Sequence, residues 1–406
     1  MLSAWLLPEH IADVLPAQAR HIEALRRHML DTAQGCGFEL VIPPLLEHLD
    51  ALLSGTGHEL DLSTFKLVDQ LSGRLLGVRA DTTPQAARID AHLLNRQDVT
   101  RLCYCGPVLH TRPTGLAATR EPLQFGAELF GHDGLAADLE VAELALDCLQ
   151  AAGVQDVVID LADARLLRGV LAGAVVDADH LKAVVQALSS KDAPALASLG
   201  AGLPGPTRDA LMALLRLYGD DEVLTAARRL LPERRLIHEA LDQLRWLAGR
   251  LRAAHPGLQV GFDLSDMSGY SYYSGVRFAI FAAGSTDSLA RGGRYDEVGA
   301  IFGRNRPAVG FSLDLKSLVE VVPAPARPRA VRAPGSDDPA LQRTVRELRA
   351  AGHIVAVDLT GHAHLDTAQG LPFDFDRELV RVGPDWQVRP VGRLGRDGST
   401  FSLETP

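Results

Sequence analysis

An all-helical stretch lies between two strand-rich parts of the chain, and this arrangement constrains the fold more than any other feature. From about residue 165 to 252, apolar residues recur every three or four positions, with Pro and Gly breaks near residues 204–206. Strand patterns occur on both sides, at residues 102–109, 123–130, 157–161, 259–263, 272–282, 288–290 and 308–313. Strands joined by hairpins and long loops favour an α+β fold, in which helices pack on one face of a mixed or antiparallel sheet. The helical stretch is then an insertion into the sheet domain.

Helices are also predicted before and between the strands. The first follows Pro16 and has apolar residues at helical spacing, namely Ile22, Leu25, Met29 and Ala33. Residues 84–94 predict a second helix, and residues 135–149 predict a third that Asp133 can cap.

A change of composition at residues 322–328, where Pro and Arg accumulate, predicts a linker. We therefore expect a core over residues 1–322, with its helical insertion at about 165–252, and a small C-terminal segment over residues 323–406. In that segment, residues 340–351 predict a helix and residues 354–359 a strand. The rest is broken by Gly, Asp and Pro, which predicts short β segments or irregular structure.

Charge and composition exclude several classes of protein. The 406 residues include 41 Lys and Arg against 51 Asp and Glu, a formal net charge of −10, whereas proteins that bind nucleic acid usually carry a basic excess. No apolar run reaches the length of a membrane span, about 18 residues, and the N-terminus lacks the pattern of a signal peptide. Four cysteines make no disulfide framework. These features predict a soluble cytoplasmic protein with neither nucleic acid nor membrane as a partner.

No motif for a metal or a cofactor stands out. Cys103 and Cys105 share one face of a predicted strand without the spacing of zinc ligands, so buried thiols are expected. His353, His362 and His364 have no recognisable ligand spacing, and no Gly-rich phosphate-binding loop occurs. We expect neither a metal nor a cofactor.

Two polar clusters could carry chemistry in the first half of the chain. Asp81 and Thr83 lie where a strand is predicted to meet a helix, and either could cap that helix, contact a ligand, or do both. On the strand at 123–130, Gln124, Gly126 and Glu128 share one face because side chains alternate along a strand. A Gln and a carboxylate on an apolar strand either form internal hydrogen bonds or face a wet cavity.

A third cluster lies in the second half. Tyr270, Tyr272 and Tyr273 are half of the six tyrosines, and Gly292-Gly293 follows them. Two consecutive glycines favour a tight turn, and the alternative is a close approach of the backbone to a small ligand.

The three clusters, in this order, resemble histidyl-tRNA synthetase, a class II aminoacyl-tRNA synthetase. The resemblance covers about residues 8–320, with matching motifs at 79–83, 106–110, 124–128, 272–273, 292–296 and 308–311. Residues 37–47, which include Pro44, resemble motif 1, the dimer-interface segment of that family. The resemblance implies a class II synthetase-like fold, in which a mixed or antiparallel sheet is flanked by helices.

By this resemblance, the amino-acid pocket is largely present. Its ligand-binding positions are occupied by Asp81, Thr83, Gln124, Glu128, Tyr272 and Tyr273. The first of these carboxylates would hold the α-amino group of histidine, and the two tyrosines would enclose the imidazole. An ammonium group needs acceptors and an imidazole needs an acid or a hydroxyl, so these residue types suit the ligand.

The catalytic arginines of the synthetase motifs are replaced by His110, Ser268 and Ser317. Adenylate formation needs fixed cations that stabilise the charge developing on the phosphates, so we expect no catalytic residues. Residues 319–406 hold 11 arginines, no lysine and 12 acidic residues, whereas an RNA-reading domain should be basic. This tail is also too short for a complete anticodon-binding domain.

A synthetase-like body with these changes resembles the regulatory subunit of the short-form ATP phosphoribosyltransferase, the first enzyme of histidine biosynthesis. Residues 5–16 and 112–124 are similar to that family rather than to the synthetase. The resemblance implies a homodimer within a hetero-octamer that contains the catalytic subunit, with histidine as feedback effector. His110, Arg112 and Arg120 are candidates for binding an anion. An active histidyl-tRNA synthetase and a stand-alone histidine-binding or amino-acid-modifying protein are the alternatives.

Overall fold

The chain divides into two units near Pro323. The structure, a computed structural model, describes residues 6–53, 58–113, 115, 118–285, 287–296, 303–359 and 373–391. Most residues up to Pro323 form the first unit, and the residues from Ala324 onward belong to the second. Trp5, His362 and His364 lie outside the described residues.

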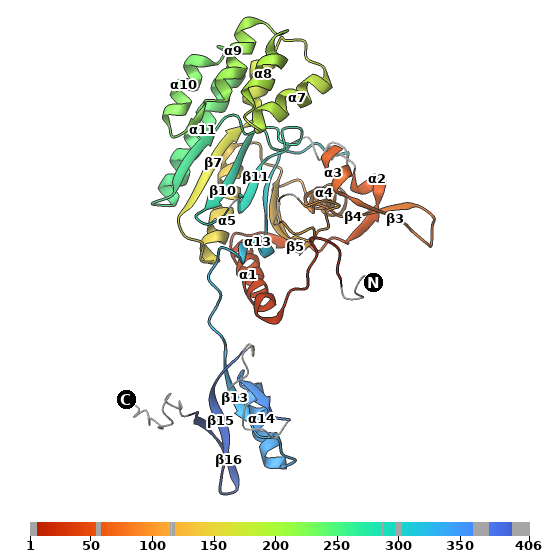
Figure 1. Cartoon of the computed structure of the whole chain (residues 1–406), viewed down its shortest axis with the longest axis vertical. Coiled ribbons are helices and arrows are strands. Elements are labelled where there is room, and N and C mark those ends of the chain that lie inside the picture. The colour runs from red at the N-terminus through yellow and green to blue at the C-terminus, as the bar shows by residue number, and fades with distance from the viewer. Residues whose placement is uncertain are drawn as a thin grey trace. The chain divides into compact units, whose positions relative to one another are not determined.

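A nine-stranded sheet organises the larger unit, in the order β1-β5-β6-β12-β11-β10-β7-β9-β8 (Figure 1). Neighbouring strands run antiparallel, except that β1 and β5 are parallel, as are β7 and β9. This mixed sheet with helices confirms the predicted α+β class. The strands are β1 Glu39–Leu40, β5 Thr100–Pro107, β6 Leu123–Phe130, β7 Val157–Asp163, β8 Tyr218–Gly219, β9 Gln259–Asp263, β10 Val276–Ala282, β11 Ala290–Arg294 and β12 Ala308–Asp314.

One face of the sheet is covered by long helices that bury its apolar residues. The predicted stripe of α1 (Pro16–Gly35) is buried, and it joins α5 (Leu135–Ala151) and α11 (Arg235–Ala254) in one core with residues of β6, β7, β10 and β12. The register puts Phe125 opposite Leu313 and Ala127 opposite Phe311 on this face. Glu128 and its neighbours therefore point to the opposite face, because side chains alternate along a strand.

The residues between β7 and β9 form a group of helices, as the sequence predicts, interrupted by the two-residue strand β8. Figure 1 shows α7 to α10 gathered beyond the edge of the sheet. The helices are α6 Ala164–Leu171, α7 Ala178–Ser189, α8 Ala193–Gly200, α9 Gly205–Leu214, α10 Glu222–Leu230 and α11.

The opposite face of the sheet is partly covered by α4 (Thr83–Arg88) and a π-helical turn, η1 (Ile89–Leu94). Their small residues Ala86 and Ala87 pack with Leu102 and Tyr104 of β5. A three-stranded antiparallel sheet precedes them in the order β2-β4-β3. The remaining elements here are β2 Leu46–His48, α2 Leu49–Leu52, α3 His58–Ser63, β3 Phe65–Val68, β4 Leu75–Val78 and, later in the chain, α13 Leu315–Leu318.

Several local predictions are wrong. The strand predicted at residues 288–290 begins only at Ala290 and continues to Arg294 as β11. The strand predicted from residue 272 begins at Val276, so the tyrosine pair precedes it in a turn. Gly292 and Gly293 form no tight turn but lie inside β11, where a Cβ on Gly292 would be 2.5 Å from the Gly310 carbonyl oxygen. Asp133 does not cap α5, because Gly134 is the N-cap residue.

The smaller unit is a four-stranded sheet in the order β14-β13-β15-β16 with one helix. The predicted helix and strand are present, but β15 and β16 form a longer hairpin than the broken sequence suggests, turning at Gly383 with a φ of 62°. The elements are β13 Arg329–Ala333, α14 Pro339–Ala350, β14 Ile354–Val357, β15 Asp374–Val382 and β16 Asp385–Pro390.

Candidate functional site

Two rows of paired residues form the floor of a pocket on the open face of the large sheet. The first row crosses four neighbouring strands. Tyr104 of β5 pairs with Gly126 of β6, and Gly126 pairs on its other side with Ser312 of β12. Ser312 in turn pairs with Arg291 of β11. In the second row, Glu128 of β6 lies between Leu102 and Gly310. Paired residues point to the same face. Residues from four strands thus converge on one place.

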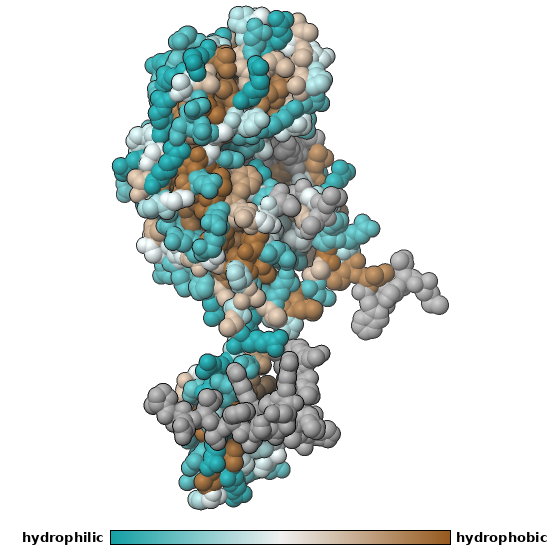
Figure 2. Space-filling view, turned by 60° about the vertical axis from the view of Figure 1, so that its left-hand side comes forward, coloured by the Kyte–Doolittle hydropathy of each residue, from teal (hydrophilic) through white to brown (hydrophobic). Residues whose placement is uncertain are grey.

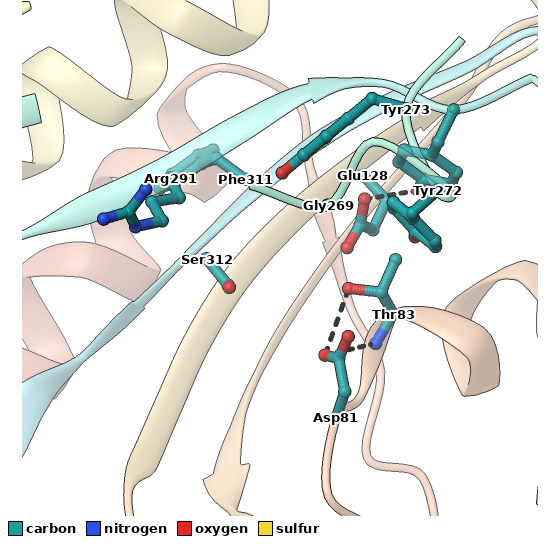
Figure 3. Close-up of a pocket in the computed structure, with 11 residues that line it drawn as sticks. Asp81, Thr83, Glu128, Gly269, Tyr272, Tyr273, Arg291, Phe311 and Ser312 are labelled. Carbon is teal, nitrogen blue, oxygen red and sulfur yellow. Dashed lines mark hydrogen bonds between the residues drawn. The ribbon is translucent and has the colours of Figure 1, made fainter. Parts of the chain in front are cut away.

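A cavity of about 180 Å³ lies above these rows (Figure 3). An engineered cavity of roughly 150 Å³ is large enough for benzene, so this pocket suits a small molecule such as an amino acid. The lining residues are Asp81, Thr83, Glu128, Gly269, Tyr272, Tyr273, Arg291, Tyr295, Gly310, Phe311 and Ser312.

Glu128 is the most buried acid of the pocket. It is 1% exposed, and its Oε1 accepts a hydrogen bond of 2.9 Å from the Tyr104 hydroxyl, while Oε2 accepts one from Tyr295. Burial raises the pKa of Glu128 to about 8, although both tyrosine hydrogen bonds oppose the rise. The carboxyl group is therefore mostly protonated at neutral pH.

Small residues make room for this arrangement. A Cβ at Gly310 would lie 1.6 Å from Oε2 of Glu128, and a Cβ at Gly126 would lie 2.4 Å from the Tyr104 hydroxyl. The gap that Gly126 leaves between two polar side chains is thus filled by a tyrosine of the neighbouring strand.

Asp81 is fixed at the start of α4 by Gln124 and Thr83. Its Oδ1 accepts hydrogen bonds from Gln124 Nε2 at 2.7 Å and from the Thr83 backbone N–H at 3.1 Å. Gln124 Oε1 in turn accepts from the Thr82 N–H at 2.9 Å. The N-cap residue of α4 is Thr82, whose side chain makes no capping hydrogen bond, so neither Asp81 nor Thr83 is the N-cap. Asp81 accepts a hydrogen bond from the first helical N–H and also lines the pocket. Gln124 forms internal hydrogen bonds, which was the alternative interpretation of this residue.

A hydroxyl links the two acids. Thr83 Oγ1 lies 3.1 Å from the Tyr104 hydroxyl, which donates to Glu128, and 3.2 Å from Asp81 Oδ1. With the Tyr104 proton donated to Glu128, the single Thr83 hydroxyl proton can be donated to Asp81 or to Tyr104 at any one time. Thr83 thus lies within hydrogen-bond distance of the groups that hold both acids.

Tyr272 and Tyr273 close the pocket from the turn before β10. The Tyr272 ring stacks on Tyr295, with 4.9 Å between centroids and 25° between planes. Among the described residues, the buried Tyr272 hydroxyl has no hydrogen-bond partner. An unpartnered buried hydroxyl is costly, so a ligand with a polar group would satisfy it.

The residues that the sequence predicts at the positions of the synthetase arginines form local hydrogen bonds. His110 Nε2 lies 2.9 Å from the Ala80 carbonyl oxygen. Ser268 Oγ donates to Asp266 at 2.7 Å, and Ser317 Oγ donates to Asp314 at 2.7 Å. None of the three belongs to the described lining of the pocket.

The candidate anion-binding residues lie together but outside the pocket lining. The Arg120 Nε donates to the His110 carbonyl oxygen at 3.1 Å, and its guanidinium lies over the Phe65 ring, 5.2 Å from the centroid. Arg112 is exposed. No group of metal-ligating side chains occurs among the described residues.

Sequence patterns did not identify two lining residues, Arg291 and Tyr295, or Tyr104, which holds Glu128 from outside the lining. The sequence signals were weak. Tyr104 lies between two cysteines that drew attention only as possible ligands, and Arg291 and Tyr295 flank a Gly-Gly pair that was interpreted as a turn.

The fold and the pocket together define a class II aminoacyl-tRNA synthetase-like protein. The family model described as histidyl-tRNA synthetase matches residues 10–318. A second model, described as the C-terminal domain of ATP phosphoribosyltransferase subunit HisZ, matches residues 328–389.

Solved structures show the same fold. A Bacillus halodurans protein, titled ATP phosphoribosyltransferase regulatory subunit/histidyl-tRNA synthetase, has a TM-score of 0.79 at 26% identity and covers 90% of this chain and 95% of its own. Histidyl-tRNA synthetase from Nostoc has a TM-score of 0.74 at 20% identity, covering 93% and 91%.

Curated relatives match almost the whole chain. A protein of Variovorax paradoxus named ATP phosphoribosyltransferase regulatory subunit is 60% identical over 96% of this chain and 100% of its own length. A protein of the same name from Verminephrobacter eiseniae is 58% identical over the same shares. The chain therefore belongs to the ATP phosphoribosyltransferase regulatory subunit family.

Proposed function

We propose that this chain is the non-catalytic regulatory subunit of the short-form ATP phosphoribosyltransferase and that histidine, the feedback effector, binds in the pocket around Glu128. The observation that carries the proposal is a pocket that holds acids and tyrosines in place. By the resemblance, His110, Ser268 and Ser317 stand where the synthetase has three arginines. Such a site can bind an amino acid without activating it.

The chemistry of the pocket suits histidine. The Asp81 carboxylate and the Thr83 hydroxyl offer acceptors for an α-ammonium group. A protonated Glu128 can donate to an unprotonated imidazole nitrogen, and the free Tyr272 hydroxyl can bond to the ring as well. Two ends of the ligand would thus be recognised by two separate acids.

The absence of synthetase activity follows from electrostatics. Loss of one preorganised charge-stabilising group can lower a rate by roughly 100- to 1000-fold. His110, Ser268 and Ser317 form hydrogen bonds to their own surroundings and offer no fixed cation to a phosphate. We therefore propose that the chain catalyses no adenylate formation.

Regulation requires a difference in affinity. Histidine can inhibit the complex only if it binds one arrangement of the subunits more tightly than another. The turn with Tyr272 and Tyr273, which joins the pocket to β10, is one element whose position a bound imidazole would stabilise.

For the assembly, we propose a homodimer within a hetero-octamer in the cytoplasm, without nucleic acid or membrane. No helix among the described residues is long and apolar enough to cross a membrane. Pro44 is exposed, and four apolar residues near it in the sequence are exposed as well, namely Leu40, Ile42, Leu45 and Leu46. Figure 2 shows that apolar residues also reach the surface elsewhere on the larger unit. The four exposed residues near Pro44 suit a dimer interface through the motif 1 segment.

For the domains, we propose that residues 1–322 act as the synthetase-like core and residues 323–406 as a small C-terminal domain that is not a complete anticodon-binding domain. The small sheet of the second unit and the acidic balance of the tail support this assignment.

The test combines the chain with the short catalytic subunit. Glu128→Ala should weaken feedback inhibition by histidine and leave the complex intact in size-exclusion chromatography. Glu320→Ala, which removes an exposed carboxylate after α13, is the control. If the Glu128 variant is inhibited like the unmodified complex, the inhibitory site lies elsewhere.

Two further assays separate the alternatives. Robust histidine-dependent exchange between ATP and pyrophosphate would identify an active synthetase. Failure to co-purify with the catalytic subunit would favour a stand-alone histidine-binding protein.

A further inference from the structure

Arg291 is the one lysine or arginine among the described residues that line the pocket. It lies on β11, in the same row as Ser312 and Gly126 and on the same face as Glu128. Figure 3 shows Asp81, Thr83 and Glu128 on one side of the cavity and Ser312 and Arg291 on the other. The pocket therefore has an acidic side and a basic side.

The guanidinium of Arg291 is only loosely held. It contacts Asp287 at 3.1 Å and lies 4.0 Å from Asp266, with 42% of the side chain exposed. An exposed ion pair of this kind contributes little to stability. Arg294, on the same strand, differs: it is buried and donates several hydrogen bonds to the buried Asp138. The Arg291 guanidinium can therefore move to a ligand, whereas Arg294 stabilises the folded chain through its buried ion pair with Asp138.

The spacing of the two sides suits a small zwitterion. Two strand spacings and two residues along a strand separate Glu128 from Arg291, which places their Cα atoms about 12 Å apart. Because both side chains rise from the same face of the sheet, their polar ends are separated by a distance of this order. A hydrogen bond of roughly 3 Å at each end leaves about half of it for the ligand. A free amino acid with a polar side chain fills such a distance, and a nucleotide does not.

The charges specify which end of the ligand goes where. Asp81 would attract an α-ammonium group and repel a carboxylate, so the carboxylate of a bound amino acid must lie away from Asp81. The Ser312 hydroxyl and the Arg291 guanidinium are the donors on that side. An arginine can bind a carboxylate with two parallel hydrogen bonds.

We propose that Arg291 binds the carboxylate of the amino-acid effector and thereby makes the pocket selective for an amino acid over the corresponding amine. The proposal rests on the proposed histidine site and adds a residue that binds the α-carboxylate, which all amino acids share. It also explains how the pocket could bind histidine after the loss of an arginine at Ser268.

The test compares L-histidine with histamine, which has the same imidazole and amine but no carboxylate. Calorimetry on the full chain should show that unmodified protein binds histidine more tightly than histamine. In Arg291→Gln, the affinity for histidine should fall roughly 10- to 100-fold, the range for a hydrogen bond to a charged group, and the affinity for histamine should stay within about twofold.

Arg235→Gln is the matched control. Arg235 is also an exposed arginine with an acidic partner four residues away, Glu239, but it lies on α11 in the helical insertion. This variant should bind both ligands like the unmodified chain, and circular dichroism should show that both variants are folded.

The outcomes are distinct. Equal loss of both ligands in Arg291→Gln, or unchanged histidine binding in that variant, overturns the role of Arg291. If the unmodified chain binds neither ligand, the proposed histidine site itself is wrong. If histamine binds as tightly as histidine to the unmodified chain, the pocket has no carboxylate-binding side, and the proposal fails while the imidazole site remains.

Discussion

Burial of Glu128 predicts that the larger unit loses stability as the pH rises. The carboxyl group is 1% exposed and lies between two tyrosine hydroxyls beneath Gly310. Burial moves its pKa from the ordinary value of 4.5 to about 8. The folded state therefore binds a proton that the unfolded state has released over this range.

The sign and size follow from linkage. Below pH 4.5 both states are protonated, and Glu128 contributes no pH dependence. Between pH 4.5 and about 8 the unfolded state is ionised and the folded state is not, so the free energy of unfolding falls as the pH rises. Above pH 8 both are ionised and the loss is complete. At about 1.4 kcal/mol per pH unit, the loss is about 5 kcal/mol.

Glu128→Gln isolates this contribution, because a neutral amide of similar shape does not titrate. Urea unfolding from pH 5 to 9, followed by Trp246 fluorescence in a Trp5→Phe/Trp386→Phe background, reports on the larger unit. Relative to Glu128→Gln, the unmodified chain should lose about 4 kcal/mol between these pH values, because part of the full loss already falls below pH 5. Glu320→Gln, which removes an exposed carboxylate, serves as the control.

A parallel pH dependence in the unmodified chain and Glu128→Gln would refute the reasoning. It would mean that Glu128 ionises in the folded state as readily as in the unfolded state. The protonated carboxyl that we assign to imidazole binding would then not exist at neutral pH.

Three further results are expected. Gly310→Ala should lower the free energy of unfolding by about 1–3 kcal/mol and abolish histidine binding in calorimetry, since its Cβ would lie 1.6 Å from Glu128 and 2.8 Å from a backbone oxygen. Tyr295→Phe should raise the pKa of Glu128 further, because the lost hydrogen bond lowers it, so the loss of stability in urea titrations should extend to higher pH. Arg306→Gln should cost about 3–5 kcal/mol in thermal or urea unfolding, because it leaves the buried Asp90 without its ion pair at 2.9 Å; a loss below 1 kcal/mol would contradict this.

Local patterns in the sequence predicted the elements whose own residues carry the signal. The apolar stripe of α1 and the alternation of β6 are properties of consecutive residues, so Ile22 and Glu128 were assigned to the correct faces. The motif order then indicated the family, because ordered motifs identify a fold without knowledge of contacts.

Local patterns misled where neighbours in space decide the structure. Gly292 and Gly293 occur in a sequence typical of a turn, but β10 and β12 on either side hold them in a strand, and their missing side chains let these strands approach. Tyr272 has the residue type of a strand, yet it lies in a turn where its ring stacks on Tyr295.

The sequence by itself determined the class of fold, the helical insertion and the two acids of the pocket, because each is a matter of residue type and order. The tertiary structure alone decided which residues surround those acids. Strand pairings between segments far apart in the chain bring Tyr104 and Arg291 beside Glu128 and Ser312, and Tyr295 directly follows one of these strands. The register of such pairings depends on the packing of the whole sheet, and no local periodicity records it.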